Sequence, residues 1–246
     1  MTFINGDGIR KYCVSRGIPY SDVDHYERYL DRHPIKDGIF VTHNGDRVID
    51  ESAIKYAEKY NITHWYCQNL MFSNPRFIPI PIGIENDYWY KEINKPEILL
   101  RMSGKISECI PSKQYYANFS IGTNQSIRLD WAQKIRSIEG VTDKISSTVI
   151  QNKESYQRYC EEILDHQYIF CPPGNGVDTH RFWEAVILGR IPIVANIEPY
   201  ISFSKIFKVG INGAVSSINI RSGIYLKFWI NAISNKMSCK EIYNII

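Results

Sequence analysis

One segment, residues 168–194, constrains the fold of this chain more than any other. It begins with an apolar run typical of a buried strand, Tyr168 to Cys171, and continues into a Pro-Pro-Gly-Asn-Gly-Val loop at 172–177. A helix is expected from Thr179 to Leu188, followed by a second apolar strand from Ile191 to Ala195. Strand, short loop, helix and strand in this order are typical of a parallel sheet whose strands are joined by helices.

Similar units are expected earlier in the chain. In the same half, the pattern predicts the strand Tyr116–Ser120, a helix from Thr123 or Asn124 to about Ile138, a strand within Lys144–Ile150 and a helix from about Lys153 to Leu164. Nearer the N-terminus, it predicts a loop and a short helix at 12–30, strands at 38–42 and 63–67, and a helix at 52–60. The proline-bearing segment 77–84 is expected to be an extended edge or a connector and not a central strand. These two rounds predict an α/β fold with two doubly wound parallel sheets.

The length of the chain, 246 residues, is compatible with one large domain or two small ones. Two rounds of strand and helix favour two domains, joined in the charged, proline-bearing stretch from Lys91 to Pro111. We therefore expect an N-terminal domain over residues 1–100 and a C-terminal domain over 101–246. Because ligands of parallel sheets gather at the carboxyl ends of the strands, we expect a site between the domains.

Charge and cysteine content exclude several function classes. The chain has 29 Lys and Arg against 26 Asp and Glu, and the two signs are mixed, so no basic stripe for a nucleic acid is present. Its six cysteines lack the Cys-x-x-Cys spacing of a zinc or redox site. No apolar run approaches the roughly 18 residues of a membrane-spanning helix, and the first residues lack a signal-peptide pattern. We expect a protein of the reducing cytoplasm without an integral membrane segment or a nucleic-acid partner, and its oligomeric state is left open.

The glycine-rich loop and the helix after it predict a site for an anion. Gly174 and Gly176 allow the backbone to come close to a ligand, and the helix N-terminus offers free N–H groups. Arg181 adds a bidentate phosphate donor at a place where a cation opposes the helix dipole. Glu184, expected to lie off the core-facing side of the helix together with Trp183, is suited to accept hydrogen bonds from the vicinal hydroxyls of a ribose.

Structural roles are open alternatives for each of these residues. Asp178 or Thr179 is equally explained as a helix cap, and Arg181 as one half of a surface ion pair. Glu184 is equally explained as a solvated side chain. His180 is suited to contact a phosphate or a sugar, or to pack against the loop.

The segment resembles the donor-binding half of GT-B glycosyltransferases, and most closely that of the exostosin-like family. The likeness is carried by Pro-x-Gly-Asn-Gly at 172–176, Asp-Thr-x-Arg at 178–181, aromatic-Glu-Ala at 183–185 and Gly-x-Ile-Pro-Ile-Val at 189–194. Residues 118–124 with Arg128 resemble the opening strand and helix of the same domain, and stretches at 41–46, 68–69 and 80–86 resemble the late acceptor-side domain. Glu184 matches the second of two glutamates in the wider retaining families, and Gly176 stands in place of the first, which favours the exostosin-like branch.

The resemblance implies a GT-B-like fold with two Rossmann-like sheets facing a cleft. It makes residues 1–100 a reduced acceptor-side domain and 101–246 the donor domain, and leaves open that the last helix packs back on the N-terminal half. It implies transfer of a sugar from a UDP- or GDP-linked donor, a co-substrate, to a glycan or other hydroxyl acceptor, with no tightly bound cofactor and no metal. The donor-binding residues that it implies are Thr123, Asn124, Arg128, Gly174, Asn175, Gly176, Asp178, Thr179, His180, Arg181 and Glu184.

Inverting transfer needs a general base for the acceptor proton. His43 and Asp46 are the candidates, because they follow a predicted strand that faces the cleft; hydrogen bonding within the turn is the alternative for His43. Asp22-Val23-Asp24 has the spelling of the metal-binding motif of the GT-A fold, but it lies in the irregular N-terminal segment and is interpreted as a solvated loop.

A second function class also fits, namely a non-catalytic nucleotide- or glycan-binding protein that retains the donor fold. The short N-terminal half favours it, whereas the intact set of Asp178, Arg181 and Glu184 with Arg128 opposes it. A Rossmann dehydrogenase is disfavoured because no Gly-x-Gly-x-x-Gly follows the first strand of either half.

Overall fold

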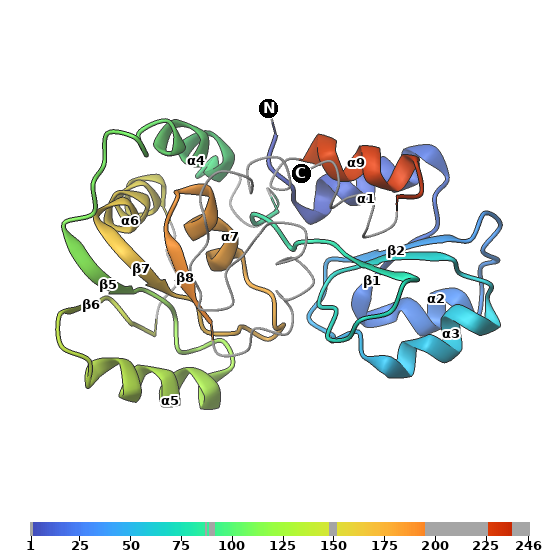
Figure 1. The fold of residues 1–246 in the computed structure, drawn as a ribbon, viewed down its shortest axis with the longest axis horizontal. Helices are drawn as coiled ribbons and strands as arrows, with labels where there is room; N and C mark the ends of the chain where they lie inside the picture. The colour runs from blue at the N-terminus through green and yellow to red at the C-terminus, as the bar shows by residue number, and fades with distance from the viewer. Residues whose placement is uncertain (1, 87, 89–91, 148–151, 195–225, 238–246) are drawn as a thin grey trace.

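The structure is a computed structural model that describes residues 2–86, 88, 92–147, 152–194 and 226–237. It contains two separate four-stranded sheets, one in each half of the chain, and every strand pair in both is parallel (Figure 1). The predicted α/β class with two parallel sheets is therefore confirmed. The arrangement is compatible with two Rossmann-like domains.

The N-terminal sheet has the strand order β1-β2-β3-β4. Its strands are β1 (Tyr20–Asp22), β2 (Ile39–His43), β3 (His64–Cys67) and β4 (Phe77–Pro79); the helices are α1 (Gly6–Arg16), α2 (Tyr26–Leu30) and α3 (Ile54–Lys59), with short 3-10 turns η1 (Val23–His25) and η2 (Glu51–Ala53). Among the described residues, strand β4 pairs with β3 alone, so the proline-bearing segment, expected to be an edge or a connector, forms an edge.

Alternate residues of β2 enter two different apolar clusters. Val41 packs with Ile9 of α1, whereas Phe40 packs on the opposite face with residues of α2 and α3. On that face Trp65 lies between Phe40 and Phe77, with 5.1 Å between ring centroids on each side. The sheet is thus covered by helices on both faces, which is why its strands are almost entirely buried.

Strand β1 and the end of helix α1 lie in the segment 12–30, where the sequence predicts a loop and then a short helix, and α1 begins before it, where no element is predicted. Only Gly6, Ile9 and Cys13 of α1 are buried, so its apolar stripe is too thin to recognise in the sequence. The ends are nevertheless well defined. The side chain of Asn5 accepts a hydrogen bond from the backbone N–H of Gly8 at 2.8 Å, and Gly17 ends the helix at φ +63°.

The C-terminal sheet has the strand order β6-β5-β7-β8. Its strands are β5 (Lys113–Ala117), β6 (Val141–Asp143), β7 (His166–Phe170) and β8 (Ile191–Ile193), and its helices are α4 (Lys95–Ser103), α5 (Gln125–Arg136), α6 (Lys153–Asp165) and α7 (His180–Ile187). Helices α4, α6 and α7 lie on one side of this sheet and α5 lies on the other (Figure 1).

Strand β6 precedes its predicted position at 144–150, because Gly140 turns the chain at φ +77° and the strand begins directly after it. Residues 148–150 of that prediction lie outside the described residues. The predicted boundary region, 91–111, contains helix α4, which buries Ile98, Leu99 and Met102 against the C-terminal half.

Helix α9 (Leu226–Ser234) returns the chain to the N-terminal half, where it lies beside α1 (Figure 1). The hydroxyl of Tyr66 on β3 lies 2.9 Å from the carbonyl oxygen of Ala232 and 2.8 Å from that of Met237. Trp229 is fully buried in the apolar cluster that joins both halves. None of the helices in the described part of the chain is long and apolar enough to cross a membrane.

Candidate functional site

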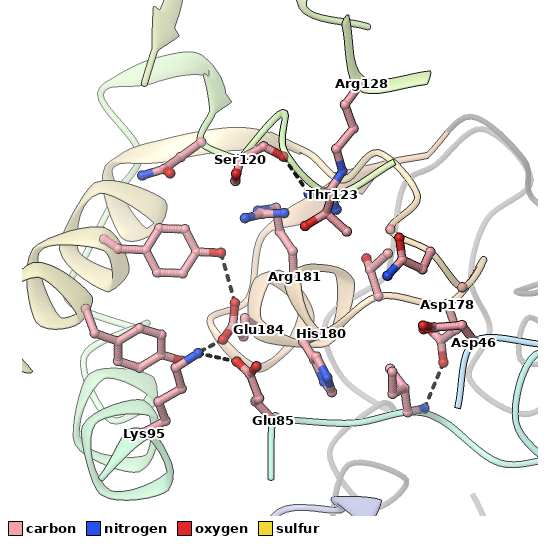
Figure 2. Close-up of a pocket in the computed structure, with 18 residues that line it drawn as sticks. Asp46, Glu85, Lys95, Ser120, Thr123, Arg128, Asp178, His180, Arg181 and Glu184 are labelled. Atoms are coloured by element: carbon pink, nitrogen blue, oxygen red, sulfur yellow. Dashed lines mark hydrogen bonds and ion pairs between the residues drawn. The ribbon is translucent and has the colours of Figure 1, made fainter. Parts of the chain in front are cut away.

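A cavity of about 330 Å³ lies where the two halves meet. In the C-terminal sheet, β5 is flanked by β6 on one side and β7 on the other, and the cavity opens beyond the carboxyl ends of β5 and β7. This is the point at which the strand order reverses, where parallel sheets bind their ligands. Its lining residues are Asp46, Ile82, Glu85, Lys95, Asn118, Ser120, Thr123, Arg128, Tyr156, Tyr159, Gly174, Asn175, Gly176, Asp178, Thr179, His180, Arg181 and Glu184 (Figure 2).

Arg128, from the first turn of α5, joins two loops at the cavity wall. Its Nε donates to the carbonyl oxygen of Pro173 at 2.9 Å, and its Nη1 donates to that of Ser120 at 2.7 Å. Burial, and after it the charge of Arg181, lower the pKa of Arg128 to about 10. Arg128 is therefore a buried cation whose charge no carboxylate of the described residues neutralises through an ion pair.

Arg181, from the first turn of α7, extends into the same cavity (Figure 2). Its Nε is buried and has no hydrogen-bond partner among the described residues, and the same holds for the hydroxyl of Thr179. Burial opposes the charge of Arg181, but neighbouring groups, Tyr159 first and also Glu184, outweigh that effect and raise the pKa of the guanidinium. Two polar groups without partners thus meet at a helix N-terminus, where an anion is stabilised.

Glu184 accepts hydrogen bonds on both carboxylate oxygens. The hydroxyl of Tyr156 donates to Oε1 at 2.7 Å and that of Tyr159 donates to Oε2 at 2.9 Å, both from α6. Burial, and after it the charge of Glu184, raise the pKa of both tyrosines well above the ordinary value. The prediction that Glu184 and Trp183 lie off the core side of the helix is wrong, because the other helices on this side of the sheet enclose α7 and both residues are buried.

Lys95 and Glu85 form an ion pair at the same end of the cavity, with 2.6 Å between Nζ and Oε2 (Figure 2). The Lys95 ammonium also lies 4.7 Å from the ring centroid of Tyr156. The sequence analysis does not identify this pair, because Lys95 lies in the stretch interpreted as a domain boundary. The proline that follows Lys95 marks a helix start, and this is the one signal available in the sequence.

Asp178 connects helix α7 to the N-terminal half. Its Oδ2 accepts from the backbone N–H of Ile82 at 2.8 Å, its Oδ1 accepts from Trp183 Nε1 at 2.8 Å, and its own N–H donates to the side chain of Asn69 at 3.1 Å. Both oxygens are engaged within the protein, so the geometry gives Asp178 a positioning role. Thr179 is the N-cap residue, and neither residue caps the helix through its side chain.

The two loops of the predicted donor site contact each other directly. Asn124 precedes α5 in the left-handed conformation, and its side-chain amide donates to the carbonyl oxygen of Gly174 at 2.7 Å. A Cβ atom on Gly176 would lie 3.1 Å from Asn69 Nδ2 and 3.3 Å from the Cα of Asp46, so only glycine fits without a shift. Asn124 thus holds the loop, whereas Thr123, Gly174, Asn175 and Gly176 line the cavity itself.

His180, the first residue of α7, also lines the cavity. Its Nδ1 lies 2.8 Å from the carbonyl oxygen of Gly83, in the segment between the two halves. A carbonyl oxygen only accepts hydrogen bonds, so Nδ1 is the nitrogen that carries the hydrogen.

The two predicted general bases have different positions. Asp46 lines the cavity. His43 does not: it is fully buried at the end of β2, with Nε2 donating to the carbonyl oxygen of Pro81 at 2.9 Å, and burial lowers its pKa to about 4. The expectation that His43 faces the cleft is therefore corrected. Asp24 has a structural role, since its carboxylate accepts from the backbone N–H groups of Asp46 and Arg47.

The described residues contain no group of three or more His, Cys, Asp or Glu side chains placed to hold a metal ion. No protein-family model matches this chain, and no curated protein is similar to it in sequence. The inference of function therefore depends on the geometry of the cavity.

Proposed function

We propose that this protein is a glycosyltransferase of the GT-B type that transfers a sugar from a UDP- or GDP-linked donor to a hydroxyl group of a glycan or other acceptor. The observation that carries the proposal is the pair of Arg128 and Arg181, which line one cavity and form no ion pair with any described residue. Two adjacent guanidinium groups match the two phosphates of a nucleotide diphosphate.

Three neighbouring features support an anion at this position. The cavity lies at the reversal point of the strand order, α7 directs its N-terminal N–H groups toward it, and the buried hydroxyl of Thr179 lacks a partner. In the proposed complex, one phosphate contacts Arg181 and the helix N-terminus, and the other lies toward Arg128 and Thr123.

The chemical demand of glycosyl transfer fits this arrangement. When the bond between the anomeric carbon and the diphosphate oxygen breaks, negative charge develops on the leaving oxygen. Guanidinium groups and helix N–H groups already held in place stabilise that charge without reorganisation. The proposal assigns this role to protein groups and not to a bound metal, so a chelator such as EDTA is expected to leave the rate unchanged.

The opposite end of the cavity is suited to hydroxyl groups. Glu85, Lys95 and Glu184 lie there with the hydroxyls of Tyr156 and Tyr159. A carboxylate offers about four lone-pair positions, so Glu184 retains acceptor capacity beyond the two tyrosine bonds. A ribose or a sugar ring presents the matching donors.

The test is nucleotide release from a panel of UDP- and GDP-sugars, with and without acceptor glycans. Wild-type protein should release one of the two nucleotides, and Arg181→Ala should bind that nucleotide more weakly and release it more slowly. Arg136→Ala is the matched control, because Arg136 pairs with Asp143 on the surface. Absence of binding to either class of nucleotide contradicts the proposal.

The second candidate is a non-catalytic nucleotide- or glycan-binding protein. One observation favours it, namely that His43, one of the two predicted general bases, is buried and does not line the cavity. Binding of a nucleotide sugar with neither transfer nor slow hydrolysis would select this candidate over the enzyme.

A further inference from the structure

We infer that His180 is the general base that takes the proton of the acceptor hydroxyl, an inference that rests on the proposed glycosyl transfer. Its imidazole lines the cavity, and its Nδ1–H donates to the carbonyl oxygen of Gly83 at 2.8 Å. In the neutral ring with the hydrogen on Nδ1, the lone pair is on Nε2. That nitrogen forms no hydrogen bond with any described residue, so it is available to a substrate.

The carbonyl that orients His180 is itself firmly held. Gly83 has φ +70°, and a Cβ atom at this position would lie 2.1 Å from the carbonyl oxygen of Ile4. The same oxygen accepts the backbone N–H of Ile84 at 2.9 Å. The backbone at residues 83–84 therefore lies directly against Ile4. A carbonyl oxygen held in this way fixes both the tautomer and the orientation of the His180 ring, as the residue that orients the base does in a catalytic triad.

The position of His180 also suits the reaction. It directly precedes Arg181, which the proposed function places at the leaving diphosphate, and both line the cavity. Successive residues of a helix project about 100° apart, so the two side chains diverge, as attack from the side opposite the leaving group requires. Its hydrogen-bond partner, Gly83, lies in the segment that links the two halves.

The two other candidates are less suited to this role. Asp46 lines the cavity, but it is exposed and its carboxylate has no hydrogen-bond partner among the described residues to orient it. His43 is buried outside the cavity lining, and Pro81 occupies its Nε2. Within the described part of the cavity wall, His180 is the only histidine.

The step balances as a single displacement. The O–H bond of the acceptor breaks and its proton passes to Nε2 of His180, while the oxygen lone pair forms the new bond to the anomeric carbon. The bond from that carbon to the diphosphate breaks, and its electron pair leaves with the diphosphate between Arg128 and Arg181. Solvent later takes the proton from His180. Attack opposite the leaving group inverts the anomeric configuration.

The substitution His180→Asn tests this role, because asparagine keeps a donor near the Nδ1 position for Gly83 and removes the basic Nε2. We expect unchanged affinity for the nucleotide and a loss of transfer of about 10²- to 10⁴-fold. His33→Asn is the matched control and should transfer as fast as wild type, because His33 is exposed outside the cavity and its Nδ1 likewise lies against a carbonyl oxygen, that of Tyr29. Wild-type transfer by His180→Asn, or loss of transfer by Asp46→Asn alone, overturns the assignment.

Two further measurements keep the outcome clear. If His180→Asn fails to fold, His180→Gly with added imidazole replaces it; rescue of transfer by imidazole supports the role, and absence of rescue contradicts it. The anomeric configuration of the product, read by proton NMR, should be inverted, and retention overturns the proposal. A wild-type protein that turns over no nucleotide sugar refutes the proposed function and with it this role, whereas an active His180→Asn refutes this role alone.

Discussion

Arg128 and Arg181 reach one cavity from two different helices, and the charge of Arg181 adds to the effect of burial in lowering the pKa of Arg128 to about 10. Like charges in one cavity repel one another, and an anion between them would offset that repulsion. Neither arginine forms an ion pair with a carboxylate of the described residues, and the hydrogen bonds that Arg128 donates to the carbonyl oxygens of Pro173 and Ser120 leave its charge uncompensated. The proposed anionic ligand would offset this repulsion.

Inorganic pyrophosphate should therefore stabilise the protein. A ligand at 100 times its dissociation constant adds about 2.7 kcal/mol to the free energy of unfolding. We expect a saturable rise in the melting temperature of the wild type and of the surface variant Arg136→Met, and little or none in Arg181→Met. Differential scanning fluorimetry across a pyrophosphate titration measures this, and an equal rise in Arg181→Met would place the anion elsewhere.

Asp178→Asn should destabilise the protein even without a ligand. The carboxylate accepts from both Ile82 N–H and Trp183 Nε1–H. In the asparagine variant, the side-chain NH₂ group faces one of these two donors, and that donor loses its acceptor. Leaving a buried donor unpaired costs about 1–3 kcal/mol. Urea denaturation should show this loss, whereas Asp130→Asn, which removes an exposed carboxylate paired with Lys134, should change stability little. Equal stability of the two variants contradicts the positioning role of Asp178.

Gly83→Ala should be far more damaging than Gly17→Ala. Both glycines have positive φ, so both variants incur the left-handed penalty of about 1–2 kcal/mol. A Cβ atom on Gly17 has no neighbour within 4 Å, whereas one on Gly83 would lie 2.1 Å from the carbonyl oxygen of Ile4. The clash should cost a further amount of about 3 kcal/mol, at the upper end of the usual overpacking cost. Similar unfolding free energies for the two variants would show that segment 83–84 does not pack against Ile4.

The stability of the protein should fall in mild acid because of His43. Burial lowers its pKa from 6.5 to about 4, although the hydrogen bond to the carbonyl oxygen of Pro81 opposes this. Below pH 6.5 the unfolded state binds the proton and the folded state does not, so stability decreases as the pH falls and levels off below about 4. The shift amounts to about 3 kcal/mol.

His43→Gln, which keeps a donor for Pro81 without the titration, is the test of that assignment. The difference in unfolding free energy between wild type and His43→Gln should become smaller as the pH falls from 7 to 4. A difference that stays constant over this range contradicts a buried neutral His43.

Much of the fold is predictable from the sequence, because short apolar runs identify most of the strands and turn residues identify where they end. Helix α7 was predicted over 179–188 and spans His180–Ile187, and the strands on either side of it lie within about two residues of their predicted starts. Strand β6 was misplaced because its residues are only partly buried and carry no clear alternation. Helix α1 was missed for the same reason, since its buried face is small.

The candidate site was predictable where two short segments, each a loop followed by the start of a helix, build it. Thr123, Arg128, Arg181 and their loop neighbours line a single cavity, as the sequence analysis expected. The partners of Glu184 were not predictable, because Tyr156 and Tyr159 come from another helix whose packing no local pattern reveals. His43 was misjudged because β2 is a central strand, so a side chain at its end is covered by the neighbouring segment instead of facing solvent.

The most direct test of the account is a calorimetric titration of UDP and GDP into wild type, Arg181→Ala and Arg136→Ala. The account predicts that one nucleotide binds wild type and Arg136→Ala equally. Arg181→Ala should bind that nucleotide about 10- to 150-fold more weakly, the equivalent of one lost charge-assisted contact of about 1.5–3 kcal/mol. Failure of both nucleotides to bind wild type, or equal binding by Arg181→Ala, would contradict the central claim that these arginines hold the diphosphate of a nucleotide sugar.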